Sequence, residues 1–334
     1  MIPFPCRYEW KPVKPLKLDA APGVTLDLID LPLPMDGYHN FFGIWLVQDD
    51  PGKRNTLVDV GPSSTVPGLL EELKNRGISR LDLILLSHIH LDHSGGLAGL
   101  LKAFPSARVA VHPRGKRHLA DPERLWESSL EVIPEMALAY GKPSPVDESV
   151  FLADSNEIHG ISYEDTPGHA PHHRSYLYRT GAGTVLFAGE AASTYSRLEQ
   201  ILQEPGNERY LLRPASPPRF YIDTALESIE KLKTLNASIM CYAHFGYTRE
   251  VRRMLQEAGD QILLWKDIFR EYMAGEGFTR PGQADMDALL TFVLERDPWL
   301  SDFSSLPEDI RSREMEFMAS SAAGFLEAVL TERT

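Results

Sequence analysis

The chain is predicted to fold as an α/β protein that carries an all-helical extension at its C-terminal end. Two patterns in the 334-residue sequence support this prediction. From about residue 24 to residue 248, short apolar segments alternate with amphipathic ones, a rhythm typical of sheets layered against helices. From residue 249 onward, apolar residues recur only at the spacing of a helix. We therefore expect two regions, an α/β domain over 1–248 and a helical region over 249–334.

The first half of the α/β domain shows a strand–helix–strand order. Segment 81–86 is apolar apart from Asp82, which predicts a strand buried on both faces of a sheet. Gly77 is a suitable helix terminator, because glycine readily adopts the left-handed conformation found at helix ends. In chain order, the expected elements are strands at 24–31 and 43–48, a helix at 68–75, a strand at 81–86, a helix at 97–104 and a strand at 108–112.

The second half begins with a helical insertion over about residues 113–147. Asp121-Pro122 favours a helix start there, since a capping side chain is followed by proline in the first turn. Farther on, Thr224 and Glu227 have the spacing of a capping box. The expected elements after the insertion are strands at 149–152, 158–164, 175–179 and 184–188, a helix at 224–235 and a strand at 237–242.

The helical region carries three apolar stripes, which predict about three helices that each bury one face. The stripes are Val251, Leu255, Ala258, Ile262, Trp265, Phe269 and Tyr272, then Met286, Leu290 and Val293, then Met315, Met318, Ala322, Phe325 and Val329. We expect these helices to pack on the α/β core as a stabilising bundle, a wall of the active site, or the surface of a homodimer.

Composition and charge limit the class of protein. With 43% hydrophobic residues the chain can bury a large core, and no apolar stretch is long enough to cross a membrane. The net charge of −13 and the pI of about 5.3 disfavour a nucleic-acid partner, which needs a basic surface for phosphate contacts. The two cysteines, Cys6 and Cys241, give no disulfide framework, and the N-terminus lacks the apolar core of a signal peptide. We expect a cytoplasmic protein that acts on a small molecule.

The residues after segment 81–86 bring metal-binding side chains together. The run Ser87-His88-Ile89-His90-Leu91-Asp92-His93 holds three imidazoles and a carboxylate. Side chains alternate along an extended segment, so His88, His90 and Asp92 lie on one side, and His93 can turn towards them at Ser94-Gly95-Gly96. Imidazole nitrogen and carboxylate oxygen are the ligands that catalytic zinc, iron and manganese accept. The run therefore predicts a metal site at the end of a strand.

Five motifs occur in the order typical of the metallo-β-lactamase superfamily of metal-dependent hydrolases, and the chain resembles that family. The motifs are Thr56-Leu57-Val58-Asp59-Val60-Gly61, His88-x-His90-x-Asp92-His93, Thr166-Pro167-Gly168-His169, Phe187-Ala188-Gly189-Glu190 and Ala243-His244-Phe245-Gly246. The resemblance implies a four-layer αβ/βα sandwich. It is strongest to glyoxalase II-like and lactonase-like members, and in glyoxalase II a helical C-terminal region helps to bind substrate.

The resemblance also implies two divalent metal ions, with zinc expected first and manganese or iron as alternatives. Carried over residue by residue, His88, His90 and His169 would hold one metal, Asp92, His93 and His244 the other, and Glu190 would bridge them. Asp92 would also orient the attacking water or shuttle its proton as the catalytic group. Asp59 and Ser87 are expected to hydrogen-bond the ligand histidines and fix their rings.

Glu190 departs from the family pattern, which usually has aspartate at the bridging position. The extra methylene shifts the carboxylate unless the backbone compensates, so two outcomes stay open. Glu190 bridges with a changed metal spacing, or it binds one metal only and leaves a mononuclear or weakly occupied second site. A mononuclear iron site would permit oxygen or persulfide chemistry.

Five further residues are candidates for contacts with substrate. His39, in the first long loop, could reach over the metals, and His172 could line the mouth of the cavity. Tyr195, Arg197 and Tyr221 could bind a substrate carboxylate or phosphate, although their segment is equally compatible with a solvated loop.

We expect a metal-dependent hydrolase in which a metal-activated hydroxide cleaves a small ester, thioester or lactone. The alternatives are a phosphodiesterase, a mononuclear-iron oxygenase or persulfide enzyme, and a non-catalytic relative that only binds a ligand.

Overall fold

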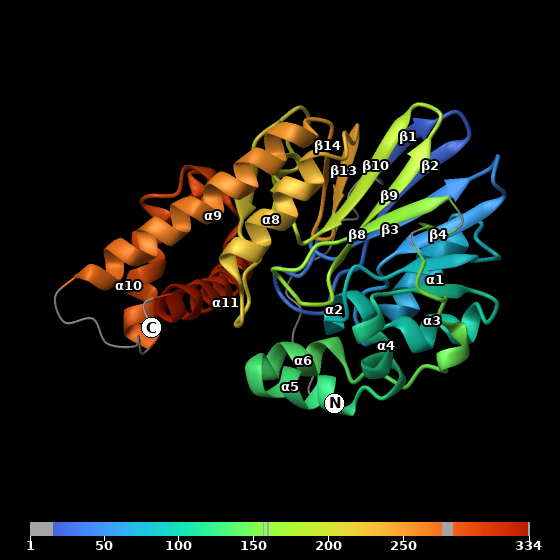
Figure 1. The fold of residues 1–334 in the computed structure, drawn as a ribbon, viewed down its shortest axis with the longest axis horizontal. Helices are drawn as coiled ribbons and strands as arrows, with labels where there is room; N and C mark the ends of the chain where they lie inside the picture. Colours follow the sequence, from blue (N-terminus) through green and yellow to red (C-terminus); the bar gives the residue numbers. More distant parts are fainter. Residues whose placement is uncertain (1–15, 156, 159, 276–282, 333–334) are drawn as a thin grey trace.

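Two six-stranded sheets face each other at the centre of the α/β region, and helices cover their outer faces (Figure 1). The computed structural model describes residues 16–155, 157–158, 160–275 and 283–332, so Cys6 lies outside the described residues. None of the helices in these ranges combines the length and the apolar character that crossing a membrane requires.

The first sheet contains six strands in sequential order. Its first four strands are antiparallel, whereas β4, β5 and β6 are parallel neighbours. The strands are β1 (Leu16–Ala21), β2 (Val24–Asp30), β3 (Gly43–Asp49), β4 (Arg54–Val58), β5 (Leu83–Leu85) and β6 (Arg108–Ala110). Since β5 directly precedes the histidine run, this sheet positions the run.

The second sheet has the order β14-β13-β10-β9-β8-β7, with β10 and β13 parallel and the other pairs antiparallel. Its strands are β7 (Glu157–Ile158), β8 (Ile161–Asp165), β9 (Arg174–Thr180), β10 (Gly183–Gly189), β13 (Ile239–Tyr242) and β14 (Tyr247–Thr248). Two further strands, β11 (Thr194–Arg197) and β12 (Tyr210–Arg213), form a separate hairpin.

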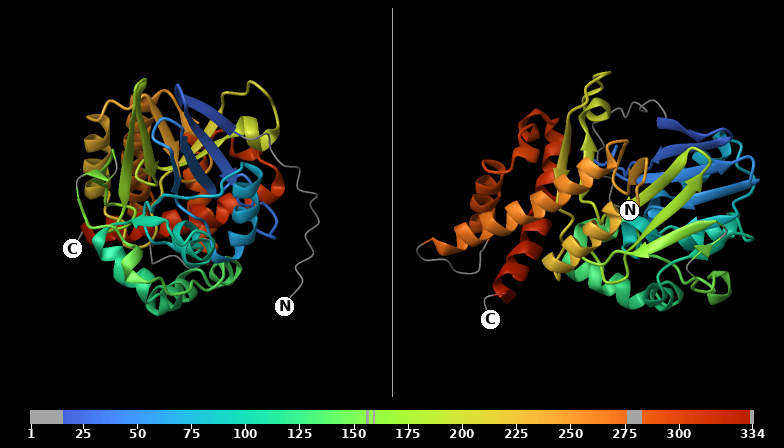
Figure 2. Two further views of the ribbon diagram at one scale, coloured as in Figure 1. Left: turned by 90° about the vertical axis from the view of Figure 1, so that its right-hand side faces the viewer. Right: turned by 45° about the horizontal axis from the view of Figure 1, so that its top comes forward.

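Three apolar clusters define the layers. One fills the space between the sheets, where Trp45 and Leu85 of the first sheet meet Tyr176 and Phe187 of the second. The second cluster joins the outer face of the first sheet to its helices, and the third joins the second sheet to α8 and the C-terminal helices. The order helix, sheet, sheet, helix confirms the expected αβ/βα sandwich, and Figure 2 shows the same layers from two further directions.

The helices of the sandwich and of the insertion follow the predicted pattern closely. They are α1 (Val66–Asn75), α2 (Leu91–Ser94), α3 (Leu97–Ala103), α4 (Pro113–Ala120), α5 (Glu123–Val132), α6 (Pro134–Tyr140), α7 (Leu198–Leu202) and α8 (Ile222–Lys233). Four short 3₁₀ helices occur at Ser63–Thr65, Glu148–Val150, Pro298–Leu300 and Phe303–Ser305.

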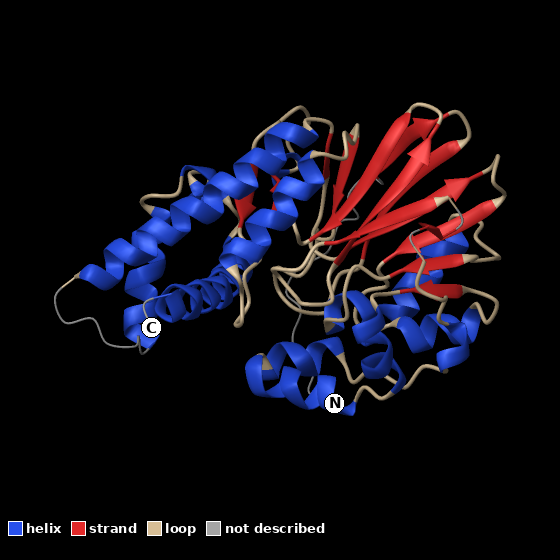
Figure 3. Ribbon diagram, in the orientation of Figure 1, coloured by secondary structure: helices blue, strands red, loops and turns tan. Residues whose placement is uncertain are grey.

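The C-terminal region contains only helices among its described residues: α9 (Val251–Ala274), α10 (Gln283–Leu294) and α11 (Glu308–Glu332). Figure 3 shows this helical part beside the strand-rich part of the chain. The predicted stripes are buried, with Trp265, Phe269 and Phe325 in one aromatic cluster. A role of this region in dimerisation stays a prediction.

Some local predictions were wrong. The strand expected at 149–152 is only partly present. Asp147 caps the Ser149 N–H and starts a 3₁₀ turn over Glu148–Val150, whereas Phe151 forms an isolated parallel bridge with Val109. The capping box at Thr224 is not formed, since α8 already begins at Ile222, whose side chain is buried in the core. The β11–β12 hairpin lies in a segment where no strands were expected.

Candidate metal centre

The candidate metal ligands lie at the carboxyl ends of strands that pair in parallel. Because β4 and β5 are parallel neighbours, Asp59 and His88 emerge at the same edge of the first sheet. The parallel pair β10 and β13 likewise brings Glu190 beside His244 in the second sheet. The loop between β8 and β9 adds His169 at this edge, since β9 runs antiparallel to β10. Strand pairing therefore gathers residues that are far apart in the sequence.

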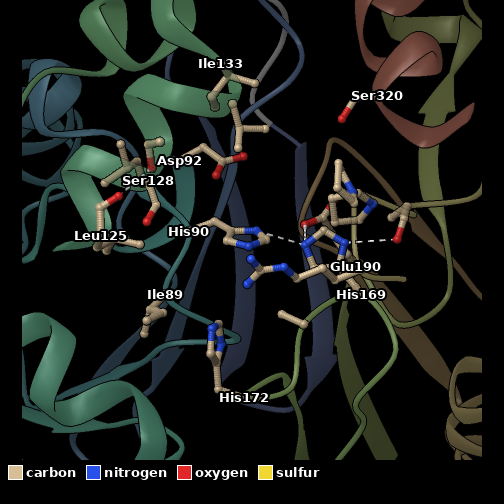
Figure 4. A pocket seen from close by; sticks show the side chains of 18 of the residues that line it. Ile89, His90, Asp92, Leu125, Ser128, Ile133, His169, His172, Glu190 and Ser320 are labelled. Carbon is tan, nitrogen blue, oxygen red and sulfur yellow. Dashed lines mark hydrogen bonds and ion pairs between the residues drawn. The ribbon is translucent and has the colours of Figure 1, made fainter. Parts of the chain in front are cut away.

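The first group of possible ligands consists of His88, His90, His169 and Glu190. His90 Nδ1 lies 2.9 Å from His88 Nε2 and 3.0 Å from His169 Nε2. The Oε2 atom of Glu190 lies 2.9 Å from His169 Nε2, and Figure 4 shows His90, His169 and Glu190 converging. Zinc bonds of about 2.0–2.1 Å in a tetrahedral site place neighbouring ligand atoms roughly 3.3 Å apart. The observed spacing is close to that of ligands around one ion.

The second group consists of Asp92, His93 and His244. The Oδ2 atom of Asp92 lies 3.3 Å from His93 Nε2 and 3.8 Å from His244 Nε2. Glu190 faces both groups, because its Oε1 is 3.2 Å from His244 Nε2 and its Oε2 is 3.4 Å from both His88 Nε2 and His93 Nε2. The grouping matches the ligand sets that the family resemblance implies.

Four ligand histidines are held through Nδ1, which directs Nε2 into the site. His169 Nδ1 lies 3.0 Å from Ala215 O, His244 Nδ1 3.2 Å from Phe41 O, His93 Nδ1 3.1 Å from Asp59 Oδ2 and His88 Nδ1 3.0 Å from Ser87 Oγ. Carbonyl and carboxylate oxygens only accept, so Nδ1 carries the proton in His169, His244 and His93. In His169 and His244 this leaves Nε2 to offer a lone pair, whereas His93 must first lose the proton on its Nε2. The buried Nε2 of His93 faces two carboxylate oxygens, Asp92 Oδ2 at 3.3 Å and Glu190 Oε2 at 3.4 Å. This donor set fits divalent metal ions.

Asp59 contacts residues that position ligands of both groups, Ser87 beside His88 and the ligand His93 itself. Its Oδ1 accepts the backbone N–H of Ser87 at 2.8 Å, and its Oδ2 accepts the Ser87 hydroxyl at 2.8 Å and faces His93. Because the Ser87 hydroxyl donates to Asp59, its lone pair is free to accept from His88 Nδ1. Asp59 has a φ of 61°, a left-handed conformation that is uncommon outside glycine and frequent at functional sites.

His173 is a positioning residue that the sequence interpretation missed. It is fully buried, accepts the backbone N–H of Glu190 at its Nε2 (3.0 Å), and contacts Thr166 Oγ1 through Nδ1 (2.8 Å). A Cβ at Gly189, which has a φ of 60°, would overlap His173 Nε2. The imidazole therefore holds the backbone from which Glu190 reaches the site. In the sequence, the available indication of this role was that His173 directly precedes the segment that forms the buried strand β9.

Helix α11 reaches the second group through Phe41. The ring of Phe41 stacks on His244, with 4.3 Å between centroids, and also contacts Phe317 of α11 at 4.7 Å. The guanidinium of Arg313 lies 4.4 Å from the centre of the Phe41 ring, and Arg313 donates to Gly37 O at 2.5 Å. The C-terminal region thus contributes to the position of a candidate ligand.

The protonation states suit metal ligands. Burial lowers the pKa of His90 to about 3 and that of His88 well below its usual value, so both rings are neutral at pH 7. Burial alone would raise the pKa values of Asp92 and Glu190, but nearby imidazoles lower that of Asp92 to about 2 and that of Glu190 well below its usual range. Burial would lower the pKa of His93, yet Asp92 and the hydrogen bonds to its ring hold it well above the usual value. Binding of a metal through His93 must therefore release a proton.

A cavity of about 840 Å³ opens above the ligands, and it has the size of a small-molecule site. One wall comes from the insertion, including Leu125, Ser128 and Ile133, and the other from α11, including Ser320, as Figure 4 shows. His90, Asp92, His169, Glu190 and His244 lie in its lining.

The five candidates for substrate contact separate into two sets. His172 and the exposed Tyr221 line the cavity. Tyr195, in contrast, is buried between Tyr210 and Tyr242, and Arg197 pairs with Glu199 at 2.7 Å. Neither lies in the cavity lining, because the unpredicted β11–β12 hairpin directs them into the core and along the surface.

His39 is also absent from the cavity lining. Its backbone carbonyl accepts a hydrogen bond of 3.0 Å from Arg313, which fastens this loop to α11 instead of leaving it free to cover the metals.

A metal-ligand set of histidines and carboxylates at the base of a cavity, within an αβ/βα sandwich, defines a metal-dependent hydrolase. A model of the metallo-beta-lactamase superfamily matches residues 44–244, more than half of the chain. The chain belongs to the metallo-β-lactamase superfamily.

Individual relatives support the same family. The chain is 26% identical over 226 residues to a metallo-beta-lactamase fold-containing protein of Sulfurisphaera tokodaii, covering 65% of this chain and 77% of the relative. It is 29% identical over 193 residues to a hydroxyacylglutathione hydrolase of Aeromonas hydrophila, covering 53% and 61% of the two chains.

Among solved structures, a metallo-beta-lactamase family protein from Thermus thermophilus has a TM-score of 0.60 at 22% identity, with 94% of this chain and 95% of that chain covered. A beta-lactamase domain protein from Burkholderia ambifaria has a TM-score of 0.57 at 17% identity, with 95% and 89% covered. These similarities show the shared fold.

Proposed function

We propose that the protein binds two divalent metal ions, zinc in the first instance, and hydrolyses a small ester, thioester or lactone. The observation that carries the proposal is the convergence of His88, His90, His169 and Glu190 with Asp92, His93 and His244 at the base of one cavity. The name of the Aeromonas hydrophila relative, a hydroxyacylglutathione hydrolase, favours a thioester or similar acyl substrate.

When bound, the metal ions would lower the pKa of a water towards ~7 and polarise the scissile carbonyl. The residues of the chain supply the remaining functions. Asp92 is ionised and lines the cavity, so its carboxylate can orient the attacking water and accept its proton. His172, which also lines the cavity, is neutral at pH 7 because burial lowers its pKa to about 4. It can therefore accept or donate a hydrogen bond to the substrate without adding charge.

Glu190 is proposed to bridge the two ions despite its extra methylene. Its two oxygens lie close to ring nitrogens of both ligand groups, at 2.9 Å from His169 and 3.2 Å from His244. The hydrogen bond from its backbone to His173 fixes the starting point of the longer side chain.

The test begins with metal content and hydrolysis. Elemental mass spectrometry of protein purified without added metal should give about two ions per chain. The metal-loaded protein should hydrolyse an acyl thioester or a lactone faster than bis(4-nitrophenyl) phosphate, and chelation or His88→Ala should abolish turnover. Asp27→Asn, at a buried position in β2, is the matched control and should remain active.

Three results would contradict the proposal. Turnover that persists in His88→Ala would exclude this site, and a preference for the phosphodiester would make the protein a phosphodiesterase. One iron per chain with oxygen uptake would indicate an oxygenase.

A further inference from the structure

One wall of the cavity carries a cluster of arginines that the proposed chemistry does not use. Arg114 and Arg117 belong to α4 and Arg124 to the first turn of α5, and all three line the cavity. Positions 114, 117 and 118 are spaced i, i+3 and i+4, so Arg114, Arg117 and His118 share one face of α4. The helix therefore presents two guanidinium groups and an imidazole to the cavity.

These arginines lack the partners that neutralise a comparable residue in the opposite wall. Arg213 lies 3.5 Å from Glu314 and donates to Ser321 Oγ at 2.8 Å. Within the described part of the chain, in contrast, Arg114, Arg117 and Arg124 have no carboxylate at ion-pair distance. All three side chains are exposed. They form a local group of positive charges on a chain whose net charge is −13. Glu131 and Glu327 also line the cavity, but among the described residues neither lies at ion-pair distance from the three arginines. Positive charge that no carboxylate contacts favours an anionic ligand.

The arginine cluster and the metal centre line the same cavity. Arg117 Nε contacts His118 Nε2 at 3.2 Å. Nearer the metal centre, the ring of His172 lies 6.1 Å from that of His90. Apolar side chains complete the lining between the charged residues, among them Leu125 and Ile133 of the insertion and Phe317 of α11. One ligand can therefore contact the metal centre, an apolar surface and the arginines.

We propose that Arg114, Arg117 and Arg124 form an anion subsite, and that the substrate is an amphiphilic ester or thioester with a terminal phosphate-like group. The scissile carbonyl lies at the metal centre, an apolar segment contacts the walls, and the anion binds the arginines. Guanidinium groups bind phosphate through paired N–H donors. A dianionic group matches three uncompensated arginines better than a single carboxylate does. The proposal rests on the proposed hydrolase function, whose substrate class it specifies.

The kinetic test compares two esters that differ only at the far end. 4-Nitrophenyl 8-phosphonooctanoate carries the anion and 4-nitrophenyl octanoate does not. We expect the wild type to prefer the phosphonate ester in kcat/KM by at least about tenfold, the value of one or two charge-assisted hydrogen bonds. In the triple variant Arg114→Gln/Arg117→Gln/Arg124→Gln this preference should fall to near unity through KM. Arg252→Gln, an exposed arginine on α9, should keep it. An equal rate with both esters, or a preference that survives in the triple variant, would overturn the subsite.

A binding measurement separates failure of the subsite from failure of the hydrolase function. Octylphosphonate is titrated by calorimetry into metal-free protein, where it cannot bind to metal ions. Affinity that falls at least about tenfold in the triple variant supports the subsite even if neither ester is hydrolysed. Absent binding, or equal binding by wild type and triple variant, refutes the subsite whatever the hydrolytic activity. Circular dichroism of the triple variant, and of the single variants Arg117→Gln and Arg124→Gln, verifies that these exposed substitutions leave the fold intact.

Discussion

Replacing Asp59 with asparagine should weaken metal binding while leaving the shape of the site unchanged. Asp59 accepts from Ser87 N, Ser87 Oγ and His93 Nδ1 at 2.8, 2.8 and 3.1 Å. An asparagine retains one acceptor oxygen and turns an NH₂ group towards the other two donors. The Ser87 hydroxyl must then rotate, and His88 and His93 are driven towards the tautomer whose Nε2 carries hydrogen. That tautomer cannot bind a metal through Nε2. Asparagine tolerates the φ of 61° at this position, so backbone strain does not confuse the result.

The expected size of this effect is a loss of about 10- to 100-fold in metal affinity, or roughly 1.4–2.8 kcal/mol. Asp59→Ala is less informative, because each buried donor that it leaves unsatisfied also destabilises folding by about 1–3 kcal/mol. The assay is competition for zinc against a chelator of known affinity, with elemental analysis of the dialysed protein. Asp27→Asn is again the control, since Asp27 is buried and its ion-pair partners in the described part of the chain, Lys17 and Arg76, lie outside the metal site. Zinc affinity of Asp59→Asn within about twofold of the wild type would refute this account of the tautomers.

Three further outcomes are expected. Glu190→Gln should lower the metal content from about two ions towards one, because it removes the charge between the two ligand groups; two tightly bound ions in this variant, by elemental analysis, would contradict the bridging role. Gly324→Ala should lower the free energy of unfolding by about 1–3 kcal/mol despite the higher helix propensity of alanine, because its Cβ would overlap Ser216 O and lie 2.5 Å from Pro217 O. The control Gly259→Ala, whose Cβ meets nothing nearer than 3.9 Å, should stabilise by up to ~1 kcal/mol in the same denaturant titrations. Burial raises the pKa of Asp30 to about 6, so ionising it costs stability, and the wild type should lose up to ~3 kcal/mol relative to Asp30→Asn as pH rises from about 4 to 7. A difference between these two proteins that does not change with pH would show that Asp30 is not the responsible group.

Most of the candidate ligands could be predicted because a buried, largely apolar strand precedes them. The strands at 81–86 and 237–242 stand out by apolar residues that only Asp82 and Ser238 interrupt, and His88 and His244 follow two residues after these segments. Parallel pairing, a consequence of the α/β rhythm, then brings those strand ends together. The order of elements predicted an α/β layered core, and the resemblance to the family implied the αβ/βα order of the layers.

The residues around the ligands, namely the cavity walls and the positioning residue His173, could not be predicted because their place depends on tertiary contacts. The strands of the β11–β12 hairpin are short and β11 is mostly polar, so its sequence resembles a loop, and Tyr195 and Arg197 were therefore candidates for substrate contact. His173 cannot be distinguished from the half-buried His172 by sequence alone, because its burial depends on the packing of β9. The cavity walls come from the insertion and from α11, and no local pattern indicates that two segments so far apart in the chain face each other.

The separate origin of the ligands and of the cavity walls has a consequence for how this protein can change over evolutionary time. Every candidate metal ligand lies at the end of a strand, in a loop of the sandwich or on the short helix α2 that follows β5, where the sandwich constrains it. The surfaces facing the remainder of a substrate belong largely to residues 113–140 and to α11, segments whose outer positions tolerate exchange. Substitutions there alter which molecules are accepted without disturbing the reactive centre, so homologues with the same ligands are expected to differ in the compounds they process.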